Sequence, residues 1–490
     1  MVRDISNNNP FIGLIFILVV SAYAFLEGTV MAIELPNIVR DLQILKETAN
    51  LAMTLLIATS AAVLVAAGRI ADQFGRRRMI LSGIILAIVS SILMATAWDA
   101  ASLLFARVAQ GVATAMILTS VALLKGMFSE EDRPRAFALF GASMGLGLAL
   151  APIVGSLSLE VGSWRAAFWI NLPILVVAYA GIRRYVPELR AQGVAVPIDV
   201  VGTILLGTGL LFAITGISEG ASLGWWAPRA ESPFAVTGLP VSIVPILLAA
   251  SVLVFAAFAY IERARLAVGK PILMDPGLLK IKAFRLGCGV SFLFVLGGYS
   301  LQFLLPIIGA SIMNIGVGQI SLLTAMIGVG IIFGGYFSAP LGLRIRPRSI
   351  VILGLLLMML GILGLRVTLR PNSDLFLLSS VLFAIGAGYG LTYSRITEIT
   401  LIGVPNDSMG LASGMLVASR TCAMAFAAAA LTAILLGNSN TALYFDLRTT
   451  HVALGLCIVI LAAALILALR LSAKSNPLSG PNSAPKRSTR

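Results

Sequence analysis

The amino-acid sequence predicts an all-α polytopic membrane protein with 14 transmembrane helices. Of the 490 residues, 59% are apolar and 11% are charged, whereas a soluble domain is about half apolar and about a quarter charged. The apolar residues gather in runs of about 20, the length of a helix that crosses a bilayer. Polar and apolar residues do not alternate within these runs as they do in membrane barrels. A soluble multidomain enzyme and a disordered chain are therefore excluded.

The apolar runs define the expected helices. The first run contains Ala22-Tyr23-Ala24, which is similar to a cleavage site, but its apolar stretch is longer than that of a signal peptide. We therefore expect an uncleaved first helix. The expected spans are residues 11–36, 49–70, 79–97, 101–124, 135–158, 165–184, 198–218, 240–261, 284–308, 318–338, 349–368, 375–399, 409–436 and 448–471.

The basic residues indicate the topology. The net charge is +14, from 35 Lys and Arg against 21 Asp and Glu. With both termini in the cytoplasm, 25 basic residues fall in inner segments and 7 in outer ones, which is the bias of cytoplasmic loops. We therefore expect cytoplasmic termini and a multi-pass protein of the plasma membrane, such as a bacterial inner membrane. No basic stripe is interleaved with aromatic residues, so we expect no nucleic-acid partner.

Few residues could support catalysis or metal binding. The chain has three cysteines, none in a CxxC pair, and one histidine, which predicts no disulfide framework, no metal site and no cofactor. An enzyme acting on membrane lipids would need clustered His, Asp or Glu, and the acids here are scattered. The sequence has no GxxxxGK[ST] loop, so transport would use ion or substrate gradients rather than ATP.

A weak internal repeat suggests two halves. Gly68 and Gly75 lie seven residues apart before a basic loop, and Gly335 and Gly342 repeat this spacing later in the chain. Internal repeats are typical of secondary transporters. We expect a six-helix bundle over residues 1–190, two inserted helices over 191–270, a second six-helix bundle over 271–473 and a disordered cytoplasmic tail over 474–490.

Four motifs in order resemble those of one transporter family. They are Gly68–Arg78, Leu104–Gly111, Gly147–Ser156, and Leu26–Thr29 with Leu35-Pro36. The chain thereby resembles the fourteen-helix drug:proton antiporter branch of the major facilitator superfamily, and the resemblance extends over nearly its whole length. It implies two six-helix bundles that work by alternating access, and proton-coupled export of small amphipathic or cationic compounds. We expect a monomer whose partners are a small-molecule substrate, protons and the lipid bilayer.

The chain also departs from the pattern of this branch. Glu27 stands where the branch usually has Asp, and Glu34 where it usually has Ala. Ala151 and Ser156 replace two glycines of the helix 5 motif, and the stretch after Pro306 lacks the usual polar residues. These departures leave the substrate open, and a dedicated exporter of one endogenous metabolite is the alternative to a multidrug exporter.

Glu27 and Arg107 are the main candidates for proton and substrate coupling. Ionisable groups within spanning helices are energetically costly and by default functional. Glu27 lies about 14 Å from Pro36, the expected outer end of its helix, and Arg107 lies about 9 Å into the fourth helix. The resemblance implies that these two helices are neighbours, so we expect the two side chains to face each other. Burial disfavours a charged carboxylate and a cation favours it, so Glu27 could bind and release a proton. A static ion pair is the alternative.

Glu34 is the second acid on this helix. It follows Glu27 by seven residues, nearly two turns, so both share one face about 10 Å apart. Glu34 is expected to be either an outer acidic station for cations or a solvated residue at the helix end.

The resemblance assigns a gating motif to Gly68, Asp72, Gly75, Arg76 and Arg78. Asp72 near a helix end can pair with the dipole of a neighbouring helix or with an arginine, and so lock the outward-facing state. The alternative is that the arginines only fix the topology. The second repeat has Ala339 at the position of Asp72, so such a latch would be one-sided.

Further positions complete the expected sites. Gly147, Pro152 and Gly155 form the antiporter motif and are expected to bend and thin helix 5. Arg395 and Glu398, three residues apart, are expected to form a local ion pair. Arg420 lies about twelve residues into its helix, at mid-membrane depth, and needs a partner. An anionic substrate and a structural tie both remain open for it.

Overall fold

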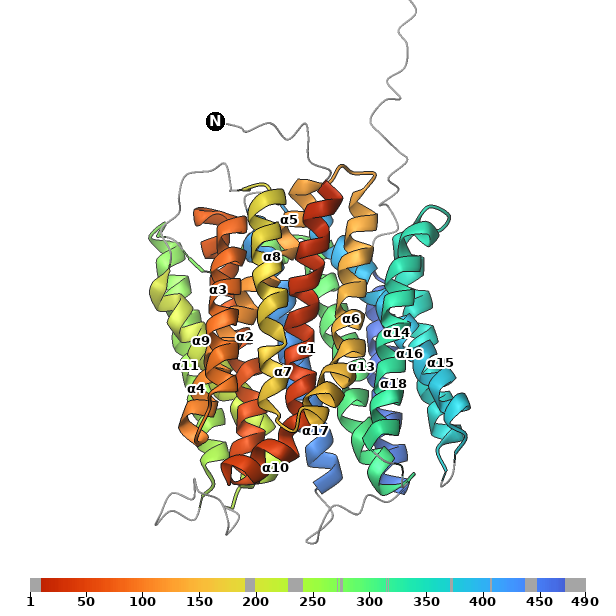
Figure 1. Cartoon of the computed structure of the whole chain (residues 1–490). Coiled ribbons are helices and arrows are strands. Elements are labelled where there is room, and N and C mark those ends of the chain that lie inside the picture. The colour runs from red at the N-terminus through yellow and green to blue at the C-terminus, as the bar shows by residue number, and fades with distance from the viewer. Residues whose placement is uncertain are drawn as a thin grey trace, which may run out of the picture.

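A computed structural model describes the chain over residues 10–189, 199–227, 241–270, 272–273, 276–313, 315, 317–370, 373–405, 408–436 and 447–471. These residues form a bundle of long helices (Figure 1), and 14 of the helices are long and apolar enough to cross a membrane. The expected tail at 474–490 lies outside this part of the chain, as does residue 190, where the first bundle was expected to end.

The helices follow the apolar runs. The first group is α1 Pro10–Leu42, α2 Lys46–Phe74, α3 Arg76–Ala95, α4 Ala100–Leu118, α5 Val121–Met127, α6 Arg133–Glu160, α7 Arg165–Trp169 and α8 Asn171–Tyr185. Between the halves lie α9 Val200–Ser218, α10 Gly220–Leu223 and α11 Ile243–Ala267. The last group is α12 Pro276–Lys280, α13 Lys282–Ser311, α14 Val317–Gly342, α15 Pro347–Thr368, α16 Leu375–Ile402, α17 Met409–Leu436 and α18 Leu447–Ala468.

Helix limits differ from the expected spans at several places, because α11 ends at Ala267 rather than 261 and the expected span 165–184 is divided into α7 and α8. The prediction that the first helix ends at Pro36 is wrong, because α1 continues to Leu42 with Pro36 inside it. Its buried face continues as well, since Ile38 is fully buried, and this packing offsets the backbone hydrogen bond that a proline removes. The single span expected over 101–124 is divided into α4 and α5 by a tight turn in which the Ser120 amide donates to the Ile117 carbonyl.

The helices form two halves with an additional pair at one side. In the first half α1 packs against α6 and α8, and α3 packs against α4; in the second half α16 packs against α14 and α15. The halves meet where α2 contacts α17 and where α6 contacts α14. Helix α9 packs against both α2 and α17, whereas α11 packs mainly against α9 (Figure 1). The additional pair therefore flanks the junction of the two halves.

Glycines permit the close approach of the halves. A side chain at Gly145 would overlap the backbone of Gly328 across the α6–α14 contact, and one at Gly68 would overlap Gly410 across the α2–α17 contact. Small residues allow helix backbones to approach closely in a membrane. The end of the bundle where α2 and α14 finish and α5 lies, at the top of Figure 1, is called the Asp72 end.

Candidate functional site

Glu27 is the centre of a buried polar cluster in the first half. It lies on α1 and is 1% exposed. Its Oε2 accepts a hydrogen bond from Gln110 Nε2 of α4 at 2.8 Å, and its Oε1 accepts one from Asn171 Nδ2 of α8 at 2.6 Å. Two amide donors therefore hold the carboxylate in one orientation, from two different helices.

Arg107 supplies the positive charge of this cluster. Its Nη1 lies 3.9 Å from Glu27 Oε2 and donates to Gln110 Oε1 at 2.8 Å, while its Nε donates to the Ala52 carbonyl of α2 at 3.0 Å. The structure thus brings Glu27 and Arg107 together. Gln110 links them by accepting from the cation and donating to the anion, so the pair is not in full contact.

Sequence reasoning did not select Gln110 and Asn171. Gln110 lies inside α4 and Asn171 is the first residue of α8. Both are at most 2% exposed, and buried side-chain amides need hydrogen-bond partners. The only feature of the sequence that could have identified them is an uncharged amide side chain within an apolar run. The run alone gave no indication of which helix would supply the partner.

Glu34 belongs to a separate contact. It is fully buried, and its carboxylate accepts hydrogen bonds from the Ser158 hydroxyl of α6 and from Asn37 Nδ2, the latter at 3.1 Å. The expectation of a solvated residue at a helix end is wrong, because α1 continues beyond Pro36 and α6 covers this side chain. Among the described residues, Glu34 has no hydrogen bond to the Glu27 cluster.

Asp72 joins the two halves at the Asp72 end. Its Oδ1 accepts from Arg76 Nη2 at 2.9 Å and from the Gly410 amide at 2.9 Å, and its Oδ2 accepts from the Leu411 amide at 3.0 Å. Gly410 and Leu411 lie in the first turn of α17, where free amides and the helix dipole favour a negative charge. Both partners expected for Asp72, a helix dipole and an arginine, are present together.

The glycines of this motif permit that arrangement. The Gly410 carbonyl occupies the place that a side chain at Gly68 would need, and Gly75 has φ = 113°, a conformation that other residues rarely adopt. Gly75 ends α2 and starts α3, which places Arg76 back against Asp72. These positions therefore fix the geometry through which α2 reaches α17.

Lys125 makes a second contact between the halves at this end. Its Nζ donates to the Val404 carbonyl at 2.5 Å and to the Leu401 carbonyl at 3.4 Å. Leu401 lies in the last turn of α16 and Val404 follows its end by two residues, where the helix dipole favours a cation. An acid thus caps the start of α17 and a base caps the end of α16, and sequence reasoning found only the first.

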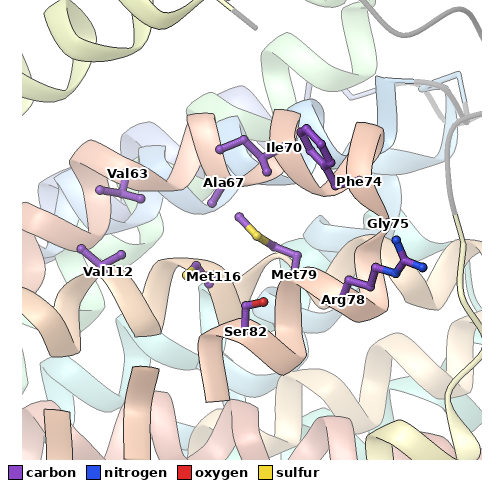
Figure 2. A pocket seen from close by; sticks show the side chains of 10 residues that line it. All are labelled: Val63, Ala67, Ile70, Phe74, Gly75, Arg78, Met79, Ser82, Val112 and Met116. Atoms are coloured by element: carbon purple, nitrogen blue, oxygen red, sulfur yellow. The ribbon is translucent and has the colours of Figure 1, made fainter. Parts of the chain in front are cut away.

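Arg78 lies apart from this contact. Its side chain is 66% exposed and its Nε lies 3.8 Å from Glu188 Oε2. It lines one end of an apolar pocket of about 370 Å³ between α2, α3 and α4, where Phe74 and Ile70 lie opposite Met79 and Ser82 (Figure 2). This pocket includes no residue of the Glu27 cluster.

The antiporter motif lies where α6 approaches α1. A side chain at Gly147 would overlap the Ala22 carbonyl of α1, and one at Gly155 would overlap Ile33. Pro152 lies inside α6 between them and removes one backbone hydrogen bond. The three positions bring α6 against the helix that carries Glu27.

Arg395 and Glu398 form the expected ion pair in α16, at 2.5 Å. Arg395 also donates from Nε to the Ser338 carbonyl at 3.1 Å and from Nη2 to the Ala339 carbonyl at 3.3 Å, both near the end of α14. A base from α16 therefore binds the position that corresponds to Asp72. The repeat preserves a contact at the helix end but reverses the sign of its charge and keeps it within one half.

Arg420 of α17 has uncharged partners. Its Nη2 donates to Thr397 Oγ1 at 2.8 Å and to Ser291 Oγ at 3.2 Å, and its guanidinium lies 4.1 Å from the centre of the Tyr393 ring. The side chain is 3% exposed, and its Nε has no hydrogen-bond partner among the described residues.

The long apolar helices, their two halves and the buried charges at their junction define a membrane transporter. The sequence profile of the Major Facilitator Superfamily matches residues 15–428, and the chain belongs to this family. It is a multi-pass protein of the plasma membrane, and its family and relatives are transporters rather than enzymes.

Curated relatives and a solved structure agree with this assignment. The chain is 33% identical to the puromycin resistance protein pur8 of Streptomyces alboniger over 77% of this chain and 72% of that protein. It is 29% identical to the probable actinorhodin transporter of Streptomyces coelicolor over 85% of this chain and 71% of that protein. The fold resembles the crystal structure of the human organic anion transporter MFSD10 with a TM-score of 0.62, at 15% identity over 94% of this chain and 97% of that chain.

Proposed function

We propose that this transporter is a proton-coupled exporter of small amphipathic compounds, cationic ones included, and that it works by alternating access with Glu27 as its proton carrier. The observation that carries the proposal is the Glu27 cluster. A fully buried carboxylate is held by two amides and lies 3.9 Å from Arg107. A protonated Glu27 would release Arg107 and Gln110 to other partners, so a change in protonation alters contacts among α1, α4 and α8 together.

The resistance proteins among the relatives support export. Pur8 is named for resistance to puromycin, and another relative, 28% identical over 81% of this chain, is the multidrug resistance protein Stp of Mycobacterium tuberculosis. The probable actinorhodin transporter supports a second candidate function, which is dedicated export of one endogenous metabolite. The proposal places both termini, and with them the Asp72 end, in the cytoplasm, as the distribution of basic residues predicts.

The test follows protons in inverted membrane vesicles with an acidified lumen and a pH-sensitive dye. Ethidium, tetraphenylphosphonium and puromycin are added in turn to wild type, Glu27→Gln and Glu34→Gln. We expect each transported compound to release protons in wild type and in Glu34→Gln, because no cation among the described residues pairs with Glu34, and no release in Glu27→Gln.

Three outcomes would contradict parts of the proposal. Equal release in wild type and Glu27→Gln would remove Glu27 from the proton path. Substrate flux without proton movement would exclude proton coupling. A wild-type response to none of the three compounds would favour the dedicated exporter.

A further inference from the structure

Arg420 differs from the other buried arginines. Four arginines in the described part of the chain are 5% exposed or less, and three of them have a carboxylate partner: Arg76 with Asp72, Arg107 with Glu27, and Arg395 with Glu398. For Arg420, the described residues provide only two hydroxyls and the face of an aromatic ring. It is therefore a buried cation without a counter-charge.

Neutral partners do not compensate such a charge fully. A guanidinium has five N–H donors, and Arg420 directs only its Nη2 to the hydroxyls of Ser291 and Thr397, while its Nε has no partner among the described groups. A buried charge is strongly destabilising unless it is paired. The donors of Arg420 without a partner belong to a planar group, and carboxylates match an edge of such a group with two parallel hydrogen bonds.

The surroundings of this guanidinium are aromatic. Tyr393, beneath the guanidinium, stacks with Tyr389 at 6.2 Å between ring centres, and Phe294 of α13 packs edge-on against Tyr389 at 5.0 Å. Aromatic side chains favour aromatic ligands through offset and edge-to-face contacts. The site lies between α13, α16 and α17, and α17 is also the helix that α2 contacts across the junction of the halves.

We propose that Arg420 binds the anionic group, a carboxylate or phenolate, of an aromatic substrate of this transporter. The proposal rests on the proposed export function and narrows it. The first half presents a carboxylate at Glu27 and the second half a guanidinium at Arg420, so the substrate class includes aromatic acids and zwitterions as well as cations. The bound anion would supply the negative charge that Arg420 lacks among the described residues.

The test is a binding measurement, so that it does not depend on transport. Purified full-length protein in lipid nanodiscs is dialysed to equilibrium against 2-naphthoate or against 2-naphthamide, which has the same ring system without the charge. We expect wild type to bind the acid about tenfold more tightly than the amide or better, as expected for one charge-assisted hydrogen bond. Arg420→Gln should abolish that preference and leave amide binding unchanged, whereas Arg420→Lys should retain part of it.

Two further variants distinguish a binding site from a structural tie. Ser291→Ala and Thr397→Val remove the neutral partners of Arg420 and keep its charge, so the preference for the acid should persist in both. Equal binding of acid and amide by wild type would overturn the proposal, even if Arg420→Gln does not fold. Equal weakening of both ligands by Arg420→Gln would do the same, and would identify a structural tie.

A small inorganic anion is the remaining occupant to separate. The dialysis is therefore repeated with gluconate and with chloride as the buffer anion. If wild type binds naphthoate in gluconate but at no concentration of chloride, the site is assigned to chloride. Failure of the proposed export function is detected by a different experiment, the vesicle assay that compares wild type with Glu27→Gln. Naphthoate binding that depends on Arg420 would remain even if no proton movement were seen there.

Discussion

Glu27 and Asp72, the two carboxylates of the first half to which the proposal gives roles, are held in different ways. The partners of Glu27 are side chains on α4 and α8 and Tyr23 on its own helix, all within the first half. Asp72 has one side-chain partner on its own half, Arg76, and two backbone amides of α17 in the other half. Under the proposed mechanism, the Glu27 cluster would persist while the halves move, whereas the Asp72 contacts would exist only while this end is closed.

If Glu27 carries the proton and Asp72 latches this end, as we propose, the difference separates proton exchange from gating. A group that exchanges a proton needs donors that remain in place whichever side is open, and side chains of one rigid half meet that need. A latch needs contacts that form in one conformation only, and amides at the start of a helix in the other half meet that need. The predictions below test this separation.

The largest effect is expected at Arg107. Arg107→Ala should destabilise the protein by about 3–5 kcal/mol, because it leaves the Glu27 carboxylate buried without a cation. The double variant Arg107→Gln with Glu27→Gln should recover part of that loss, since no buried charge remains. Thermal unfolding followed by tryptophan fluorescence measures both. A double variant less stable than Arg107→Ala would mean that the loss does not come from an unpaired charge at Glu27. It would therefore contradict the view that the Glu27 cluster is a self-contained unit.

A smaller effect, of a different kind, is expected at Asp72. Asp72→Asn removes the charge that binds Arg76 and the start of α17, and should shift the ratio of open to closed molecules at this end by about tenfold, as for the loss of one charged hydrogen bond. The distance between spin labels at Phe74→Cys and Leu343→Cys, positions that are 58% and 85% exposed, reports this change in a background without the native cysteines.

Arg78→Gln is the matched control for Asp72→Asn. It removes a charge from the same motif, but Arg78 is 66% exposed and pairs with Glu188 of the first half, so its distance distribution should equal that of wild type. A shift of equal size in both variants would mean that the charge of the loop, rather than the contact with α17, holds this end closed. An unchanged distribution in Asp72→Asn would remove Asp72 from the latch.

The sequence predicted the fold well because lipid imposes a simple rule. Each apolar run of bilayer length forms a helix, since its backbone groups must be satisfied within the segment, and all 14 expected spans are present. The predicted end of α1 was wrong because the helix continues past Pro36, where Ile38 is buried. The apolar run alone does not show this packing.

The charged side chains of the sites were also predictable, but their partners were not. Glu27 and Arg420 stand out because charges are rare in apolar runs, and Asp72 stands out by its place in the Gly68–Arg78 motif. Gln110 and Asn171 are uncharged, and their importance follows only from the packing of α4 and α8 on α1. Lys125 binds carbonyls at the end of α16, and every residue has a carbonyl, so no side-chain pattern marks such a partner.

The smallest effect is expected at Asp99, which begins α4 outside both sites. Its Oδ1 accepts from the Ser102 amide at 2.8 Å, and its own amide donates to Ser102 Oγ at 3.1 Å. The Ser102 hydroxyl, and after it the Ser102 amide, holds the pKa of Asp99 below its ordinary value. A carboxyl with a lowered pKa stabilises the folded state above its unfolded value of about 3.9, and this stabilisation is lost as the pH falls through the folded value.

Asp99→Ala should therefore lower the melting temperature slightly at pH 6, and the difference from wild type should narrow in acid below about pH 4. Because Asp99 contacts neither Glu27 nor α17 among the described residues, proton release in vesicles and the spin-label distance should both equal those of wild type. A change in proton release or in the spin-label distance would mean that a substitution at the start of α4 affects the Glu27 cluster or the Asp72 contacts. In that case the two carboxylates would not act through separate contacts, since α4 also carries Arg107 and Gln110.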